Sequence, residues 1–202
     1  LEQAIKQEIP EVETNTLQGT YFDTLRDIDK VNGRKKVILF LGSNIGNLRH
    51  KPAIEFLKNL RASVNPGDLI LMGFDQKKNP QTILDAYNDK TGITEAFNKN
   101  ILARINRELG GDFVLDNFLH WEVYDPETGT AKSYLVSKEN QTINIESLQL
   151  QIRLKKWETI HTEISQKYDD ATVEWLAEQS GLQIVTEFAD GQNQYKNYVF
   201  KK

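Results

Sequence analysis

The chain contains no cysteine and no apolar run long enough to cross a membrane. The absence of cysteine excludes disulfides and thiol catalysis, and it is compatible with a reducing cytoplasm. No transmembrane helix is therefore expected, and no signal peptide is recognisable near Leu1. The formal net charge of −4 gives no excess of positive charge that would attract nucleic acid or an anionic membrane. We expect a cytoplasmic protein with neither nucleic acid nor a membrane as its partner.

A glycine-rich loop of the form G-x-G-x-x-G is also absent from the sequence. The chain begins at Leu1 rather than Met, within a helical pattern that puts Leu1, Ala4, Ile5 and Ile9 on one face. We interpret the sequence as a truncated, C-terminal portion of a longer protein. Its 202 residues are enough for one sizeable domain, or for a domain with a large insertion.

The most informative stretch is an apolar run at residues 37–41, which is followed by a turn of small residues from Gly42 to Asn47. An amphipathic segment at residues 51–64 comes next, so the pattern predicts a buried parallel strand, a turn and a helix. In open α/β sheets, ligands bind outside the carboxyl ends of such strands. We therefore expect a small molecule to contact the backbone between Gly42 and Asn47.

The rest of the sequence predicts a parallel α/β core that is interrupted by a lobe of a different kind. We expect an α/β fold with core segments at residues 1–75 and 168–202 and an inserted α+β lobe at residues 76–167. The expected helices cover residues 1–8, 53–64, 80–109 with an interruption at 88–92, and 171–180. The expected strands cover residues 12–17, 36–41, 69–74, 119–123, 132–137, further segments within 141–165, 182–188 and 195–201, with a turn at 19–21 and a loop at 31–34.

Several motifs occur in an order that resembles a known family. They are Gly42-Ser43-Asn44-Ile45-Gly46-Asn47-Leu48, Pro66-Gly67-Asp68, Asp85-Ala86-Tyr87-Asn88-Asp89, Ala96-Phe97-Asn98-Lys99-Asn100, Asn106-Arg107-Glu108-Leu109-Gly110 and Ile160-His161-Thr162-Glu163-Ile164-Ser165-Gln166-Lys167. As a set, they are similar to the histidine-specific N-α-methyltransferases of ergothioneine biosynthesis, which use S-adenosylmethionine (SAM). The resemblance implies a class I, Rossmann-like methyltransferase core. In that family the glycine-rich SAM loop and the acidic residue that holds the ribose lie upstream of the part matched here.

The resemblance implies stepwise methylation of the α-amine of histidine to trimethylhistidine in the intact enzyme, with SAM as cofactor and without a metal. Methyl transfer from SAM requires in-line positioning of a neutral amine and exclusion of water. We therefore expect binding and orienting groups, and no residue in a catalytic role. The 202 residues alone are expected to be inactive. Two alternatives remain open: an N-methyltransferase for another amino acid, such as a tryptophan derivative, and a non-catalytic binding module that has lost SAM.

The resemblance assigns the amino-acid substrate to residues of the turn and the lobe. Asn47 matches the Asn that holds the substrate backbone, and Tyr87 matches a Tyr that reaches the substrate carboxylate. Asn47 as a helix cap and Tyr87 as a packed helix residue are the alternatives. Glu163 and Ser165 match the pair that holds the imidazole, and alternation along a strand puts them on one side. A solvated strand face is the alternative, because His161 and Lys167 have the same parity.

Two positions depart from the family's pattern. At the adenine, the family often carries an acidic residue and an aromatic one, whereas this chain has Thr20 and Tyr21, with Asp23 as another candidate for the acid. Ser133 replaces a methionine that contacts the imidazole in family members. Thr20, Tyr21, Gly42 and Ser43 are the expected cofactor-binding residues.

We also expect an exposed sheet edge. In the class I fold, the strand that ends at Leu41 normally pairs with a strand that lies upstream of Leu1. Unpaired strand edges recruit partners. Self-association, a swapped strand or an irregular segment before residue 35 is therefore predicted.

Overall fold

The computed structural model describes residues 2–28 and 35–202, so Leu1 and the loop predicted at 31–34 lie outside the described residues. The helices are α1 (Glu2–Glu8), α2 (Tyr21–Ile28), α3 (His50–Ala62), α4 (Pro80–Tyr87), α5 (Ile93–Leu109) and α6 (Asp170–Ser180). The strands are β1 (Val37–Phe40), β2 (Leu69–Asp75), β3 (Phe118–Asp125), β4 (Thr130–Ser137), β5 (Gln141–Ile145), β6 (Leu150–Leu154), β7 (Thr159–Gln166), β8 (Gln183–Ala189) and β9 (Tyr195–Lys201).

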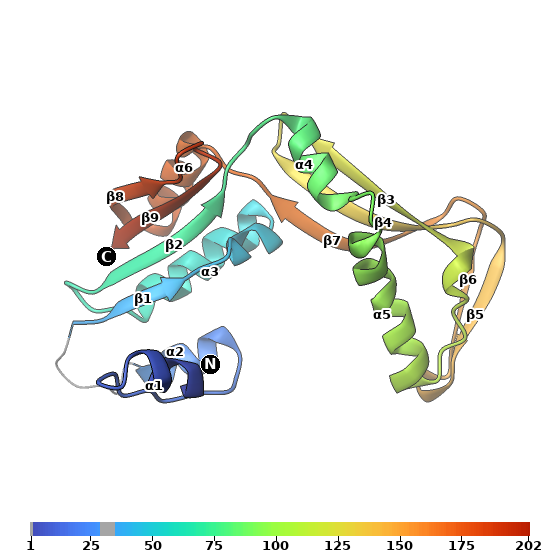
Figure 1. Cartoon of the computed structure of the whole chain (residues 1–202), viewed down its shortest axis with the longest axis horizontal. Helices are drawn as coiled ribbons and strands as arrows, with labels where there is room; N and C mark the ends of the chain where they lie inside the picture. The colour runs from blue at the N-terminus through green and yellow to red at the C-terminus, as the bar shows by residue number, and fades with distance from the viewer. Residues whose placement is uncertain (1, 29–34) are drawn as a thin grey trace.

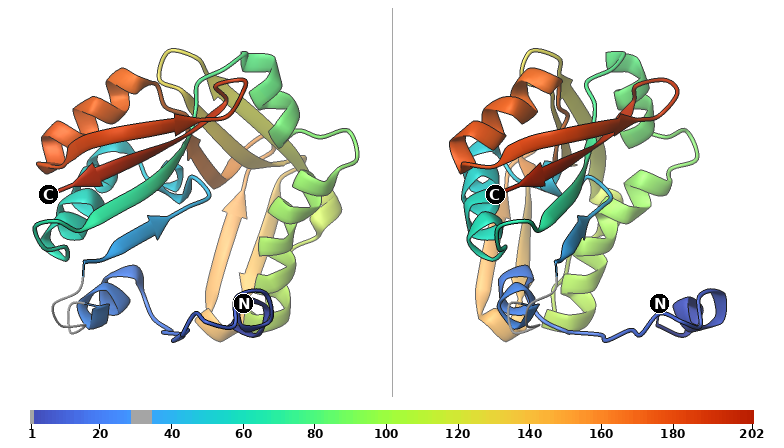
Figure 2. Two further views of the ribbon diagram at one scale, coloured as in Figure 1. Left: turned by 60° about the vertical axis from the view of Figure 1, so that its left-hand side comes forward. Right: turned by 90° about the vertical axis from the view of Figure 1, so that its left-hand side faces the viewer.

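The core is a four-stranded mixed sheet in the order β1-β2-β9-β8. Strands β1 and β2 are parallel and are joined by α3, whereas β9 runs antiparallel to both β2 and β8. The figures show α3 and α6 together on one face of this sheet (Figures 1 and 2). The predicted α/β class with a Rossmann-like core is confirmed, and so are the β-α-β unit and the closing antiparallel hairpin.

The amphipathic pattern of the sequence explains how this core is packed. Alternate residues of β2, namely Ile70, Met72 and Phe74, are fully buried. They pack in one cluster with apolar residues of α3 and α6, such as Leu57 and Leu176. Burial of such side chains is the main term that holds the helices on the sheet.

The lobe has a three-stranded antiparallel sheet in the order β3-β4-β7, a separate β5-β6 hairpin, and helices α4 and α5. Its buried residues form a second cluster that includes Leu102, Phe118 and Leu135. Helix α5 ends at Gly110, whose φ of 65° is the left-handed conformation that commonly terminates helices. The lobe lies at the opposite end of the molecule from the core (Figure 1). Residue limits of 76 and 167 for the insertion stay a prediction.

The strand predicted at residues 12–17 is wrong, because this segment is irregular and exposed. Its apolar side chains Val12 and Leu17 are 43% and 55% exposed, and none of the described strands pairs with it. A short apolar pattern without a partner strand does not form a ladder.

The segment that follows is helix α2 rather than a turn ending at Tyr21. Its first turn is stabilised by Thr20, whose hydroxyl accepts a hydrogen bond from the Asp23 backbone N–H (3.3 Å).

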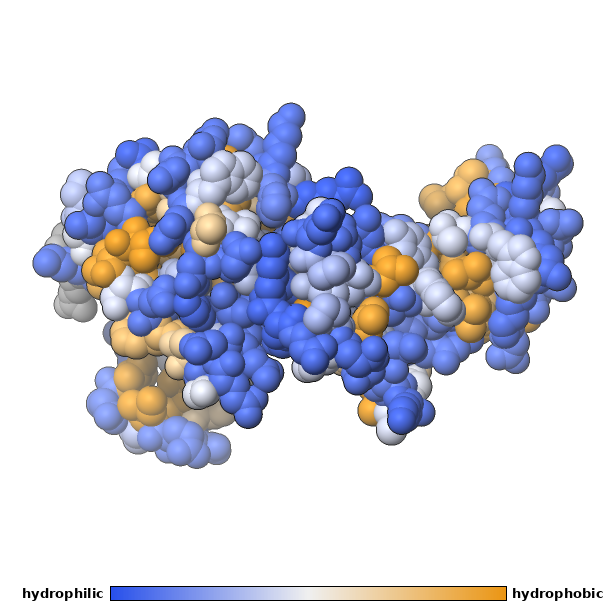
Figure 3. Space-filling model, turned by 90° about the horizontal axis from the view of Figure 1, so that it is seen from above, coloured by the Kyte–Doolittle hydropathy of each residue, from blue (hydrophilic) through white to orange (hydrophobic). Residues whose placement is uncertain are grey.

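Within the described sheet, β1 is an edge strand, as the sequence predicts. The prediction that this strand is buried is wrong, because β1 lies parallel to β2 at the sheet edge and its Val37 and Leu39 are 61% and 60% exposed. Seen from above, most of the surface is hydrophilic and the hydrophobic residues gather in separate patches (Figure 3). None of the described helices is long and apolar enough to cross a membrane.

Candidate functional site

The turn after β1 has the conformation that its small residues allow. Gly42 and Ser43 both have positive φ values, 76° and 54°, and a short 3-10 helix (η1, Asn44–Asn47) follows. The Ser43 N–H donates to Tyr195 Oη (3.1 Å), and Ser43 Oγ accepts from the backbone N–H of Asp75 (2.9 Å). The turn is thereby attached to the carboxyl end of β2 and to the start of β9.

Gly46 brings this turn close to the lobe. A Cβ atom at this position would lie 2.9 Å from the Gln166 carbonyl oxygen, so only glycine allows this approach. The Tyr168 hydroxyl donates to the Ile45 carbonyl (3.2 Å) next to it. The end of β7 and the turn after β1 therefore form one surface, although more than a hundred residues separate them in the sequence.

A pocket of about 350 Å³ lies on this surface. Six of the nine site residues that the sequence predicts line it together, which are Gly42, Ser43, Asn47, Tyr87, Glu163 and Ser165. Asp75, Lys167 and Tyr195, which sequence reasoning did not assign to the site, complete the lining. The pocket thus combines ends of core strands with α4 and β7 of the lobe.

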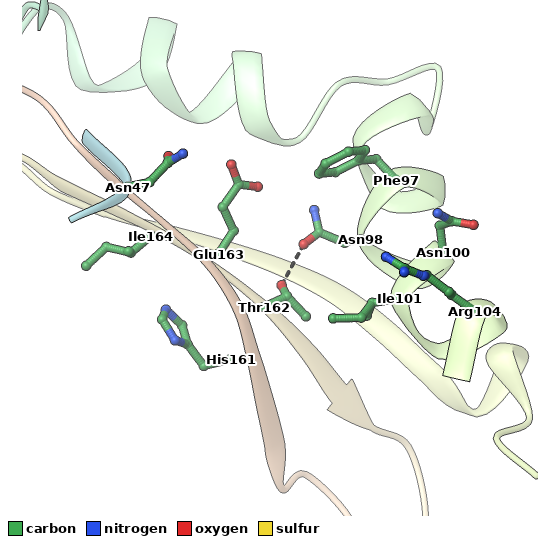
Figure 4. Close-up of a pocket in the computed structure, with 10 residues that line it drawn as sticks. All are labelled: Asn47, Phe97, Asn98, Asn100, Ile101, Arg104, His161, Thr162, Glu163 and Ile164. Atoms are coloured by element: carbon green, nitrogen blue, oxygen red, sulfur yellow. Dashed lines mark hydrogen bonds between the residues drawn. The ribbon is translucent and has the colours of Figure 1, made fainter. Parts of the chain in front are cut away.

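Asn47 occupies a junction between pockets. It also lines a second pocket of about 500 Å³ beside α5, together with Glu163 (Figure 4), and a third of about 440 Å³ beside α2 and α3. Helix α3 has Arg49 as its N-cap residue, so Asn47 is not the helix cap that the alternative proposed. Among the described residues, the Asn47 side chain has no hydrogen-bond partner, and its donor and acceptor are free to meet a ligand.

Lys167 is the centre of a buried polar network in the 350 Å³ pocket. Its side chain is only 2% exposed, and its Nζ lies 2.8 Å from Asp75 Oδ2. The same ammonium donates to Tyr87 Oη (2.8 Å) and to Ser165 Oγ (2.7 Å). Tyr87 Oη donates in turn to Ser165 Oγ (2.7 Å). One lysine therefore connects β2 of the core with α4 and β7 of the lobe.

The charge of Lys167 is compensated. Burial alone would lower the pKa of Lys167, but Tyr87 and Asp75 outweigh this effect and hold its pKa above the usual range. Asp75 also accepts from Lys78 Nζ (2.6 Å) through its other oxygen. The pocket therefore has a permanent ammonium group in its wall, close to the Tyr87 and Ser165 hydroxyls.

A β-bulge changes the direction of the side chains on β7. Ser133 of β4 pairs with Glu163, and the next residue, Tyr134, pairs with His161, which leaves Thr162 as the extra residue. His161 consequently lies against Tyr134, with a ring-centroid separation of 5.2 Å. Glu163 and His161 leave the strand in different directions (Figure 4). Simple alternation, which puts His161 on the same side as Glu163, is therefore wrong at this point.

Ser133 lies behind the pocket rather than in its lining. It is 1% exposed, and its hydroxyl donates to Glu122 Oε2 (2.5 Å) on the neighbouring strand β3. Glu122, Ser133 and Glu163 are cross-strand neighbours in one row. Burial, aided by the charge of Glu163, raises the pKa of Glu122 to about 7.

The residues predicted for the adenine are only partly brought together. Tyr21 lines the third pocket, where it makes edge contacts with Phe40 (5.4 Å) and Phe56 (5.9 Å). Thr20 does not line that pocket, and its hydroxyl donates to Asp23 Oδ2 (2.6 Å). The pocket is mostly apolar, with Asn47 at its border with the other two pockets.

Sequence reasoning missed Asp75 and Lys167 as pocket residues. Asp75 is the last residue of β2, and the rule that ligands bind at carboxyl ends of parallel strands could have found it. Lys167 ends the motif at residues 160–167 and has an even spacing from Ser165, but neither signal gives it a role. In the described part of the chain, no cluster of three or more His, Asp or Glu residues could hold a metal ion. The site consists of hydrogen-bonding and orienting groups.

Comparison with known proteins shows which proteins this chain is related to. A family model described as histidine-specific, SAM-dependent methyltransferase matches residues 1–202. A histidine N-α-methyltransferase from Mycolicibacterium smegmatis is 35% identical over 179 residues, covering 89% of this chain and 55% of that protein. One from Mycobacterium tuberculosis is 35% identical over 165 residues, covering 82% and 51%. An L-tryptophan methyltransferase from Psilocybe serbica is 28% identical over 193 residues, covering 91% and 53%. The chain spans about half the length of these relatives.

Proposed function

Since the chain belongs to the SAM-dependent histidine-specific methyltransferase family, we propose that the full-length protein transfers methyl groups from SAM to the α-amine of histidine, stepwise to trimethylhistidine. The two mycobacterial relatives are named for this activity. The single observation that carries the proposal is the pocket in which Asn47, Glu163 and Ser165 meet between the core and the lobe.

The proposal assigns the amino-acid backbone of the substrate to Asn47. A carboxamide can accept from the substrate amine and donate to its carboxylate at the same time. Asn47 borders both the polar pocket and the aromatic pocket of Tyr21. A group held by Asn47 is therefore well placed to receive a methyl from a cofactor in the aromatic pocket, which direct transfer requires.

The third pocket has the chemistry that a purine needs. Tyr21, Phe40 and Phe56 supply apolar and aromatic surface, on which a flat ring can pack. Asn44 and Asn47, in the turn at the carboxyl end of β1, also line this pocket, where cofactors of α/β sheets bind, whereas Gly42 and Ser43 line the 350 Å³ pocket. We assign the adenine end of SAM to this aromatic pocket of about 440 Å³, which Asn47 borders. When bound, SAM supplies the electrophilic methyl group, and the protein orients the amine and excludes water.

The polar wall of the 350 Å³ pocket favours an imidazole over an indole. Glu163 can accept from a ring N–H, and Ser165 and Lys167 make the remainder of this wall polar. An indole has a ring N–H but no acceptor nitrogen, so it would leave the Ser165 hydroxyl hydrogen without a partner, which is unfavourable in a pocket shielded from water. A tryptophan-type substrate remains the second candidate, because one relative is named an L-tryptophan methyltransferase.

The test is product analysis with the full-length protein. It is incubated with SAM and an equimolar mixture of histidine and tryptophan, and the products are separated and identified by mass spectrometry. We expect mono-, di- and trimethylhistidine in sequence. Methylated tryptophan alone would support the second candidate, and SAM binding without any methyl transfer would point to a non-catalytic module. The cytoplasmic location and self-association stay predictions.

A further inference from the structure

Lys167 has a role in the pocket beyond stability. We propose that Lys167 is a positioning residue that fixes the direction of the Ser165 hydroxyl hydrogen, so that the pocket selects a neutral side chain with one donor and one acceptor. In histidine this is the uncharged imidazole, not the imidazolium. The inference rests on the proposed function, because it concerns the same amino-acid pocket.

The hydrogens of the network can be counted. An ammonium group has three hydrogens to donate, and Lys167 uses them on Asp75, Tyr87 and Ser165. The two hydroxyls have one hydrogen each, and one of these lies in the 2.7 Å bond between Tyr87 Oη and Ser165 Oγ. One hydroxyl hydrogen is left over. It cannot point toward the ammonium, and it is therefore available to a ligand.

The direction of the bond between the hydroxyls determines which residue has this hydrogen. A phenol is a stronger hydrogen-bond donor than an aliphatic hydroxyl, so Tyr87 donates in this bond, and Ser165 accepts from both Tyr87 and Lys167. Among the described residues, the Ser165 hydroxyl has no acceptor of its own. Tyr87 is thereby occupied within the protein, and Ser165 is the donor that faces the pocket.

Ser165 and Glu163 then form a complementary pair. Both lie on β7 beyond the bulge at Thr162, two residues apart on one face. Glu163 supplies an acceptor and Ser165 supplies a donor. A neutral azole matches this pair, because it has an N–H and a nitrogen lone pair. An imidazolium has two N–H groups, so it would direct one of them at the Ser165 hydrogen.

The experiment uses histidine analogues with the full-length enzyme. Thiazolylalanine has a ring acceptor nitrogen but no ring N–H, and pyrrolylalanine has a ring N–H but no acceptor. Each is used in the two isomers that place the nitrogen at either ring position of histidine. The readout is the ratio of kcat/KM for the better thiazole isomer to that for the better pyrrole isomer.

We expect Lys167→Met and Ser165→Ala each to lower this ratio about tenfold. Asp75 retains Lys78 as a partner in Lys167→Met, so its carboxylate is not left unpaired. Tyr87→Phe is the matched control, because it removes a hydroxyl of the same network and leaves Lys167 donating to Ser165. The ratio should stay within about twofold of the wild-type ratio in this variant, because any lost contact with the substrate carboxylate affects both analogues equally and cancels in the ratio.

Two results would overturn the inference. If Tyr87→Phe lowers the ratio and Ser165→Ala does not, the free hydrogen belongs to Tyr87. If Lys167→Met reduces kcat/KM equally for both analogues, Lys167 only stabilises the fold. Should Lys167→Met fail to fold, the comparison of Ser165→Ala with Tyr87→Phe decides the question alone. Failure of the proposed function is distinct from these results, because the wild-type enzyme would then methylate neither histidine nor the analogues.

Discussion

Glu163→Ala in the full-length enzyme should specifically lower kcat/KM for histidine. Glu163 lies in the wall shared by the 350 Å³ and 500 Å³ pockets, where its carboxylate can accept an imidazole N–H. Its removal takes away one charge-assisted hydrogen bond and leaves the ring N–H without a partner. Such a loss costs about 1.5–3 kcal/mol, which corresponds to roughly a ten- to hundredfold reduction in kcat/KM.

The assay compares kcat/KM for histidine and tryptophan, with SAM affinity measured by calorimetry. The substitution also enlarges the pocket and makes it less polar, so tryptophan should be relatively favoured. Glu178→Ala, which removes a carboxylate from an exposed position of α6, is the matched control. If Glu163→Ala reduces activity equally for both amino acids, or mainly weakens SAM binding, Glu163 has a structural role and the imidazole is bound elsewhere.

Three further predictions concern stability and assembly. Gly73→Ala should lower the free energy of unfolding by about 1–3 kcal/mol, because the new Cβ would lie 1.8 Å from Tyr195 Oη. In a Tyr195→Ala background the cost measured by denaturant titration should shrink, and an equal cost in both backgrounds would refute this contact. The raised pKa of Glu122, about 7 against an ordinary 4.5, means that its contribution to stability is present below pH 4.5 and is lost as the pH rises through 7. Glu122→Gln should therefore reduce the loss of unfolding free energy between about pH 5 and pH 8 by about 2 kcal/mol, and an unchanged pH dependence would contradict the assignment. Leu39→Lys on the edge strand should reduce self-association of this chain in light scattering, and a chain that is monomeric without the substitution would oppose the prediction.

Local patterns predicted most of the elements that build the site, but not helix α2, which carries Tyr21. The apolar run before Gly42 and the small residues after it predicted both β1 and the turn, because β-rich residues favour a strand and a positive φ places strong demands on residue type. The helix ends at Gly110 and Gly181 were predictable for the same reason, and both glycines have left-handed conformations. The strand predicted at 12–17 failed because pairing depends on a neighbour that local sequence does not reveal.

The sequence could not reveal how the lobe strand meets the core. The bulge at Thr162 reverses the side on which His161 lies, and a bulge depends on the pairing between β4 and β7 rather than on local pattern. The role of Lys167 depends on contacts with Asp75 and Tyr87, which are distant in the sequence. Motif resemblance placed Asn47, Glu163 and Ser165 in one site, but only the tertiary structure shows the lysine that joins its two halves.

The most direct test of the proposed site is a crystal structure of the full-length protein with histidine and the demethylated product of SAM. We expect the histidine backbone to lie within hydrogen-bond distance of Asn47. Its ring should lie between the Glu163 carboxylate and the Ser165 hydroxyl. Histidine bound instead beside Phe97 and Arg104, with Glu163 and Ser165 making no contact to it, would contradict the account.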